Sequence, residues 1–337
     1  IELSEKLKEL APCPTSKVLF GTSGSEANDM QMKLTWYYNN ARGKPAKKKI
    51  ISRQRGYHGV TIASGSLTGL AMVHTDFDLP IKNVLHTTCP HYYRGGMDGE
   101  TEDQFTDRLA QDLDDLIQRE EPDTVAAFIA EPVMGAGGVV VPPMSYFPKI
   151  NGVLAKYDVR FIADEVICGF GRTGNWFGTQ TFGMKSTSIS MAKAITSAYF
   201  PMSAITIEED LYQAMVDESK KIGTFGHGFT YTAHPVGCAV ALKTIEIYQR
   251  DKIVEHVRKV APVFLARLTK LADHPLVGEA RGVGLIGALE LVADKKTKRA
   301  FDPKKMVGAT CVNFLQELGL INRAMGDSIA FCPPLII

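Results

Sequence analysis

The sequence predicts an α/β protein whose core is a mostly parallel sheet with flanking helices. Short apolar runs of strand length alternate with longer amphipathic segments, as in chains of strands joined by helices. Two runs, residues 125–130 and 161–163, are apolar throughout and end in acidic residues followed by Gly-rich turns. Buried parallel strands have such continuous apolar runs, and open α/β sheets bind ligands beyond the carboxyl ends of their strands. We therefore expect a binding site at these strand ends.

The length of the chain predicts a second, smaller domain. Its 337 residues exceed the size at which one core usually keeps growing. The sequence also changes character after about residue 250, where Gly-rich turns and short strands follow a pair of helices. We expect a large domain over residues 1–250 and a smaller α+β domain over residues 251–337.

The composition is that of an ordinary globular enzyme, with 45% hydrophobic residues, 22% charged residues and a net charge of +1. This balance gives no electrostatic footprint for nucleic acid or an anionic membrane, and no apolar run reaches the ~18 residues of a transmembrane helix. The six cysteines form no CxxC pair, and the eight histidines have no ligand spacing with them. We expect free thiols, no metal site and a reducing compartment, the cytoplasm.

The spacing of apolar residues and the positions of Gly and Pro predict the individual helices and strands. Residues 72–102 have no clear period, so we expect a long surface excursion there. Further expected strands lie at 18–20, 49–52, 204–207 and 288–291; expected helices lie at 1–12, 30–36, 103–119, 146–157, 252–272 and 304–318, with another that ends near residue 251.

The most informative stretch is residues 161–193, which contains a well-placed acid and lysine. Asp164 directly follows the apolar run, and Lys193 comes 29 positions later. A lysine in an apolar setting can carry a free amine, which forms a Schiff base with a carbonyl. An acid at a strand end can keep the pyridine nitrogen of pyridoxal phosphate (PLP) protonated. Each residue alone is more often a surface lysine or an acid that caps a loop. The pair therefore indicates a PLP site only if a phosphate site accompanies it.

Residues 21–28 provide such a phosphate site. The run Gly-Thr-Ser-Gly-Ser-Glu-Ala-Asn follows a short strand and opens a helix, and the N–H groups and positive dipole of a helix N-terminus attract anions. The run has neither the Gly-Lys-Ser/Thr of a P-loop nor the GxGxxG of a dinucleotide site, which argues against a kinase-like nucleotide binder. An ordinary helix cap is the alternative.

A loop at residues 55–59 supplies an aromatic residue between two glycines. Tyr57 could lie over a flat ring or be a half-buried loop residue, and the sequence leaves both open. His58 has no metal-binding partner nearby in the sequence, so we expect it to form structural hydrogen bonds.

Together, these motifs resemble those of the class III PLP-dependent aminotransferases, which have fold type I. The resemblance is closest to the omega-amino acid/amine:pyruvate aminotransferases and spans nearly the whole chain. The motifs occur in the family's order, and the ordered set is far more specific than any single motif. They are residues 23–28, 56–59, 130–132, 163–174, 191–193, 227–231 and 333–335.

The resemblance implies roles for individual residues. Lys193 would form the Schiff base with PLP, and Asp164 would pair with the pyridinium nitrogen. Thr230 would reach the phosphate of the neighbouring subunit, which implies a homodimer that could pair into a tetramer. Arg323 would bind a substrate carboxylate through two parallel hydrogen bonds. The other expected cofactor contacts are Gly24 and Ser25 at the phosphate, Tyr57 and Val166 on the two ring faces, and His58, Glu131, Ile167 and Phe229; Tyr57 would also touch the substrate.

Two departures from the family narrow the expected substrate. Members that act on ornithine or 4-aminobutyrate carry a second Glu five positions after the first, where this chain has Ala136. They often have Gln where this chain has Ile167, so the pocket should be less polar. We expect a transaminase that moves an amino group from an amine or omega-amino acid to pyruvate by a ping-pong mechanism, giving alanine and an aldehyde or ketone. We also expect the family's N-terminal arm to be missing from residues 1–337 and the C-terminal domain to be truncated.

The sequence does not exclude other enzyme classes that use the same residues. A 2-oxoglutarate-dependent aminotransferase, an aminomutase and a decarboxylating transaminase all share this cofactor frame. A non-catalytic PLP-fold binding module is an alternative of another class, and the presence of lysine, acid and phosphate loop together argues against it.

Overall fold

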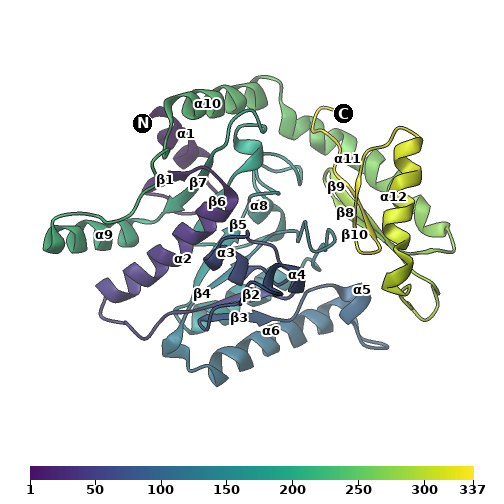
Figure 1. Cartoon of the computed structure of the whole chain (residues 1–337), viewed down its shortest axis with the longest axis horizontal. Helices are drawn as coiled ribbons and strands as arrows, with labels where there is room; N and C mark the ends of the chain where they lie inside the picture. Colours follow the sequence, from purple (N-terminus) through teal and green to yellow (C-terminus); the bar gives the residue numbers. More distant parts are fainter.

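The computed structural model describes all residues, 1–337, and contains two sheets (Figure 1). The larger sheet has seven strands in the order β1-β7-β6-β5-β4-β2-β3. Strands β6, β5, β4, β2 and β3 are parallel, whereas β7 is antiparallel to both β6 and β1. The mostly parallel sheet predicted from the sequence is confirmed. Its strands are β1 (Lys17–Gly21), β2 (Lys49–Arg53), β3 (Val84–Thr87), β4 (Val125–Ala130), β5 (Arg160–Asp164), β6 (Ser188–Met191) and β7 (Ser203–Ile207).

Twelve α-helices surround the sheets, and each helix expected from the sequence is present. None is both long and apolar enough to cross a membrane. The helices are α1 (Glu2–Leu10), α2 (Gly24–Ala41), α3 (Ile62–Leu67), α4 (Ala71–His74), α5 (Tyr92–Gly95), α6 (Glu102–Arg119), α7 (Tyr146–Lys156), α8 (Gly178–Phe182), α9 (Glu209–Ile222), α10 (Pro235–Arg250), α11 (Ile253–Lys270) and α12 (Val307–Glu317).

Helices cover both faces of the large sheet, and the side chains of its central strands alternate between them. Phe128 of β4 packs in a core that includes residues of α6 and α7, whereas Ile129 packs in a second core with Met32 of α2. Neighbouring side chains of a strand point to opposite faces, so a strand covered on both sides is apolar throughout. This explains why every residue of β4 and β5 is buried.

The second sheet is antiparallel and lies at the C-terminal end of the chain, with α11 and α12 around it (Figure 1). Leu268 of α11 packs against Leu289 and Ile329 of this sheet. The proposed division into domains at residue 250 stays a prediction. The strand order is β10-β11-β9-β8, with β8 (Val277–Val283), β9 (Ile286–Leu291), β10 (Arg323–Met325) and β11 (Ser328–Phe331).

Two strands of the large sheet were not predicted. The expected surface excursion at 72–102 is wrong in part, because residues 84–87 form the edge strand β3, which pairs with β2. Strand β6 has the sequence Ser-Ile-Ser-Met and is fully buried. Its Ser188 hydroxyl donates to the carbonyl of Thr206 at 2.7 Å and accepts from Gln31 at 2.6 Å. Hydrogen bonds to distant residues therefore allow polar side chains in this central strand.

The aromatic core beneath β5 provides a test of the packing. Phe161 is buried, with its ring centroid 5.6 Å from that of Phe128 and 6.0 Å from that of Phe147. Phe161→Ala should lower the free energy of unfolding by about 3–5 kcal/mol, because it leaves a cavity in a packed core. Phe77→Ala, at an exposed aromatic residue, should change it by less than about 0.5 kcal/mol. Urea unfolding of the two variants measures the difference, and equal midpoints would contradict this packing.

Candidate active site

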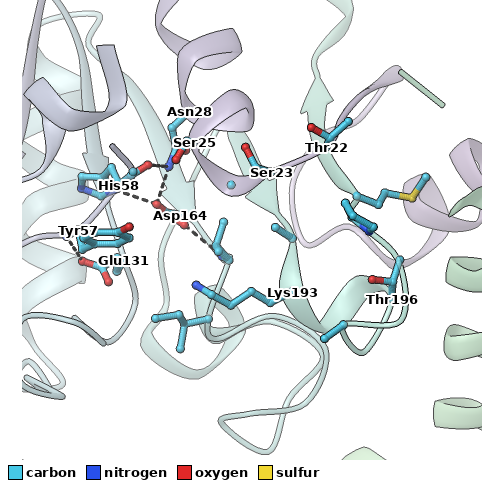
Figure 2. Close-up of a pocket in the computed structure, with 18 of the residues that line it drawn as sticks. Thr22, Ser23, Ser25, Asn28, Tyr57, His58, Glu131, Asp164, Lys193 and Thr196 are labelled. Atoms are coloured by element: carbon cyan, nitrogen blue, oxygen red, sulfur yellow. Dashed lines mark hydrogen bonds and ion pairs between the residues drawn. The ribbon is translucent and has the colours of Figure 1, made fainter. Parts of the chain in front are cut away.

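A cavity of about 400 Å³ lies at the carboxyl edge of the large sheet (Figure 2). Its wall comes from the end of β5, the start of α2, the segments after β2 and β4, and the segment after β6. These segments are far apart in the sequence and meet because parallel strands end at the same edge. The predicted site residues on the wall are Gly24, Ser25, Tyr57, His58, Glu131, Asp164, Val166, Ile167 and Lys193.

Asp164 is the last residue of β5, and its carboxylate is only 3% exposed. Its Oδ2 atom lies 2.8 Å from Nδ1 of His58 and 2.8 Å from Nδ2 of Asn28 (Figure 2). Its Oδ1 atom accepts the backbone N–H of Val166 at 3.1 Å. Donors on both oxygens stabilise a buried carboxylate in its charged form. Such a carboxylate can face a protonated ring nitrogen.

Lys193 reaches the same cavity from β6. In the parallel pairing of β5 with β6, Ser190 is the partner of Asp164, so the chain leaves β6 at the edge where Asp164 lies. The Lys193 side chain is exposed to the cavity, and its amine forms no hydrogen bond or ion pair (Figure 2). Its backbone has φ +45°, a left-handed conformation that costs a residue with a side chain about 1–2 kcal/mol. The structure thus places an unpaired amine opposite the buried acid.

The start of α2, where the sequence predicts an anion site, lies on the cavity wall. Ser23 caps the helix by accepting the N–H of Glu26 at 3.2 Å. A Cβ atom on Gly24 would lie 3.1 Å from the side chain of Val166, so a larger residue here would require Val166 to shift. The small residues leave the first N–H groups of α2 facing a cavity, where they can bind a phosphate.

Glu131 fixes the segment that carries Tyr57. Its two carboxylate oxygens accept the backbone N–H groups of Tyr57 at 2.9 Å and of Gly135 at 3.1 Å. Burial raises the pKa of this carboxyl above its ordinary value. Glu131 thus contributes to the wall and also holds the backbone at Tyr57 in place, a role that the sequence did not indicate.

Three predicted site residues lie away from the cavity wall. Thr230 is exposed, and Phe229 lines a separate hollow beside Lys33 and His227. Arg323 begins β10 in the C-terminal sheet and is exposed. The role expected for Thr230 involves a second subunit, that of Phe229 the cofactor and that of Arg323 a bound substrate, so all three stay predictions.

The cavity wall also contains residues to which the sequence analysis gave no role. Asn28 lies one helical turn after Gly24 and therefore on the same face of α2; that spacing was the available signal. The segment after Lys193 adds an apolar side to the cavity. Nothing in its sequence predicted this position, because a 3-10 turn and an irregular loop lead to it. Its wall residues are Ala198, Phe200, Pro201 and Met202.

Comparison with known proteins identifies the family. A model of the aminotransferase class-III family matches residues 1–337. The chain belongs to the class III aminotransferases. These are PLP-dependent enzymes, and a Lys amine, a buried carboxylate and a helix N-terminus on one cavity wall fit the aldehyde, ring nitrogen and phosphate of PLP. The resemblance inferred from the sequence is confirmed, as is the fold.

Two relatives of this class III aminotransferase are named as an aminotransferase and a transaminase. It is 50% identical over 337 residues to the uncharacterized aminotransferase y4uB of Sinorhizobium fredii, covering 99% of this chain and 72% of the relative. It is also 50% identical over 322 residues to gamma aminobutyrate transaminase 1 of Solanum lycopersicum, covering 96% of this chain. The chain spans 62% of the length of that tomato protein.

Solved structures resemble the class III chain closely. A transaminase solved with L-alanine is 57% identical, with a TM-score of 0.98 over 100% of this chain and 79% of that one. The omega transaminase of Pseudomonas jessenii in complex with PMP is 52% identical, with a TM-score of 0.98 over 100% of this chain and 74% of that one.

Glu165, the neighbour of Asp164, gives a prediction about pH. It is buried, and burial raises its pKa to about 7, although the N–H groups of Thr179 and Gly178 at 2.6 and 2.9 Å oppose that shift. The folded state then binds more protons than the unfolded state between about pH 4.5 and 7. This part of the stability is therefore full at low pH and lost as the pH rises through about 7.

Urea unfolding at pH 5.5, 6.5 and 8 measures this effect. The wild type should lose stability over this interval, and Glu165→Gln, which does not titrate, should lose less. Because Gln cannot accept both N–H groups, the variant should also be less stable at pH 5.5 by about 1–3 kcal/mol. Parallel pH curves for the two proteins would show that Glu165 is not the titrating group.

Proposed function

We propose that this protein is a transaminase that moves an amino group from an amine or omega-amino acid to pyruvate, giving alanine and an aldehyde or ketone. The observation that supports it best is the arrangement of the unpaired amine of Lys193 and the buried carboxylate of Asp164 on one cavity wall, beside the helix N-terminus of α2. The order would be ping-pong, with the carbonyl product leaving before pyruvate enters.

The cofactor and the residues of the cavity would each have a distinct role in the reaction. PLP, when bound, supplies an electron sink that makes the bonds at the carbon next to nitrogen easier to break. Asp164 would stabilise a proton on the ring nitrogen, and the start of α2 would hold the phosphate. The Lys193 amine would take the proton from the donor carbon next to nitrogen and later return it, as general base and then general acid. Tyr57 and Val166 would cover the two faces of the ring.

The apolar side of the cavity favours a donor with an uncharged body. Phe200, Met202 and Ile167 lie on the wall, and Ala136 stands where other family members have a second acid. The relatives support the class of donor and acceptor: one is named a gamma aminobutyrate transaminase, and one structural neighbour was solved with L-alanine, the product that pyruvate would give. Arg323 would bind the carboxylate of an acidic donor or of pyruvate.

The active unit would be a homodimer, with Thr230 contributing to the phosphate site of the other subunit. Thr230 lies in a segment with little cover from its own chain, since Thr230 and Tyr231 are exposed. Pairing of dimers into a tetramer and a cytoplasmic location are further proposals.

The essential amine gives the first test. Lys193→Ala should lower alanine formation from pyruvate and an amine donor by more than about a thousandfold, because the chain then lacks both its nucleophile and its acid–base group. Lys185→Ala removes an exposed lysine that lies between β5 and β6 and is not on the cavity wall, and it should leave the rate unchanged. A Lys193→Ala enzyme that turns over at near the wild-type rate would overturn the proposed function.

The acceptor and the reaction type need a second test. Purified protein is loaded with PLP and given a panel of amines and omega-amino acids with pyruvate or 2-oxoglutarate, and products are read by mass spectrometry. We expect alanine to form faster than glutamate. Faster glutamate formation would indicate a 2-oxoglutarate-dependent aminotransferase. Product formation without an acceptor would indicate an aminomutase, and release of CO2 would indicate a decarboxylating transaminase. PLP binding without any turnover would indicate a binding module.

A further inference from the structure

Asn28 joins three of the elements that form the cavity. It lies in the second turn of α2 and is 1% exposed. Its side-chain Nδ2 atom is 2.8 Å from Oδ2 of Asp164 at the end of β5 and 2.7 Å from the carbonyl oxygen of His58, next to Tyr57 (Figure 2). One amide group therefore connects the phosphate helix, the acid and the aromatic segment.

The direction of this amide follows from its partners. A carboxylate and a backbone carbonyl only accept hydrogen bonds, so the NH2 group of Asn28, with its two hydrogens, has to face them. The remaining oxygen, Oδ1, is buried and has no partner.

These hydrogen bonds separate the tasks of the two Asp164 oxygens. A carboxylate oxygen has two lone-pair sites. On Oδ2 both are used, one by Asn28 and one by Nδ1 of His58. Oδ1 accepts only the N–H of Val166, at 3.1 Å, and keeps one site for a further donor. Asn28 and His58 thus fix the rotation of the carboxylate and leave Oδ1 available.

We infer that Asn28 is a positioning residue for the cofactor: it orients the Asp164 carboxylate so that Oδ1 is free to accept a hydrogen bond from the pyridine ring, and it ties the Tyr57 segment to the phosphate helix. The inference rests on PLP binding in this cavity and not on the identity of donor or acceptor.

The chain contains a matched control for this role. Gln31 lies one turn further along α2, is 2% exposed, and donates through its own amide to Ser188 Oγ at 2.6 Å and to the Ile189 carbonyl at 3.2 Å. Like Asn28, it is a buried amide that bridges α2 to the sheet through two acceptors. Unlike Asn28, it does not contact Asp164 and is not on the cavity wall.

The experiment compares Asn28→Ala, Asn28→Asp and Gln31→Ala with the wild type. The dissociation constant for PLP is measured by equilibrium dialysis with the apoprotein, and the melting temperature of each apoprotein reports folding.

Asn28→Ala should weaken PLP binding by about tenfold to a hundredfold, because the buried carboxylate loses a donor. Asn28→Asp keeps the shape but places a second acid against Asp164, so it should bind PLP more weakly than Asn28→Ala. Gln31→Ala should lower the melting temperature while changing PLP affinity by less than about threefold.

Steady-state kinetics of the PLP-saturated enzymes add a second readout. Asn28→Ala should lower kcat by about tenfold or more with a change of less than about threefold in the KM of the amine donor, because the residue acts on the cofactor and not on the substrate. Asn28→Ser, which retains one donor, should recover part of both losses and covers the case in which Asn28→Ala does not fold.

Three results would overturn the inference. They are PLP affinity and kcat of the Asn28 variants within about twofold of the wild type, an equal loss of PLP affinity in Gln31→Ala, and PLP binding by Asn28→Asp at least as tight as by Asn28→Ala. If the wild type binds PLP but transfers no amino group, the proposed function fails, and the affinity comparison still decides the role of Asn28.

Discussion

The buried carboxylate of Asp164 is the constraint on which the rest of the site depends. An isolated charge in a protein interior costs many kcal/mol unless donors surround it. Here the donors come from α2, from the segment after β2 and from the turn after β5. The charge is tolerable only when these three elements are in place, so the hydrogen bonds that stabilise this part of the fold also shape the cavity.

The lysine lies in a contrasting environment. Its amine is unpaired and exposed to the cavity, and its backbone is one of several left-handed residues in a short stretch, with Ser197 and Ala198. The neighbouring structure holds this conformation: Ile195 is buried, and the Thr196 hydroxyl donates to the carbonyl of Phe200. Local strain beside a reactive group persists only when surrounding contacts determine it. The position of the amine therefore reflects the packing around it.

The C-terminal sheet is connected to the loop that follows Glu131 through buried charged groups. Arg281 of β8 donates to the carbonyl of Val139 at 2.9 Å and pairs with Glu290 at 2.9 Å. Although burial would raise it, the pKa of Glu290 is lowered to about 2 by Arg281 and by a hydrogen bond from Ser328. His91, Glu279 and Glu290 have ligand atoms within 4.8 Å of one another, and the guanidinium of Arg281 already supplies their positive counterpart. This network links the second sheet to the loop that follows Glu131.

The sequence alone determined the residue types and their local settings. The continuous apolar runs of β4 and β5, the acid that follows each of them, and the small residues that open α2 are local patterns, so the strands, the helix start and the strand-end acids could be predicted. The order of the motifs then indicated the family. Tertiary structure decided what depends on distant partners. Polar Ser188 could be recognised as part of a central strand only with Gln31 and Thr206 beside it, and Asn28 meets Asp164 across 136 positions. The spacing of residues along the sequence cannot predict such a contact, because the contact exists only after the parallel strands have brought their ends to one edge of the sheet.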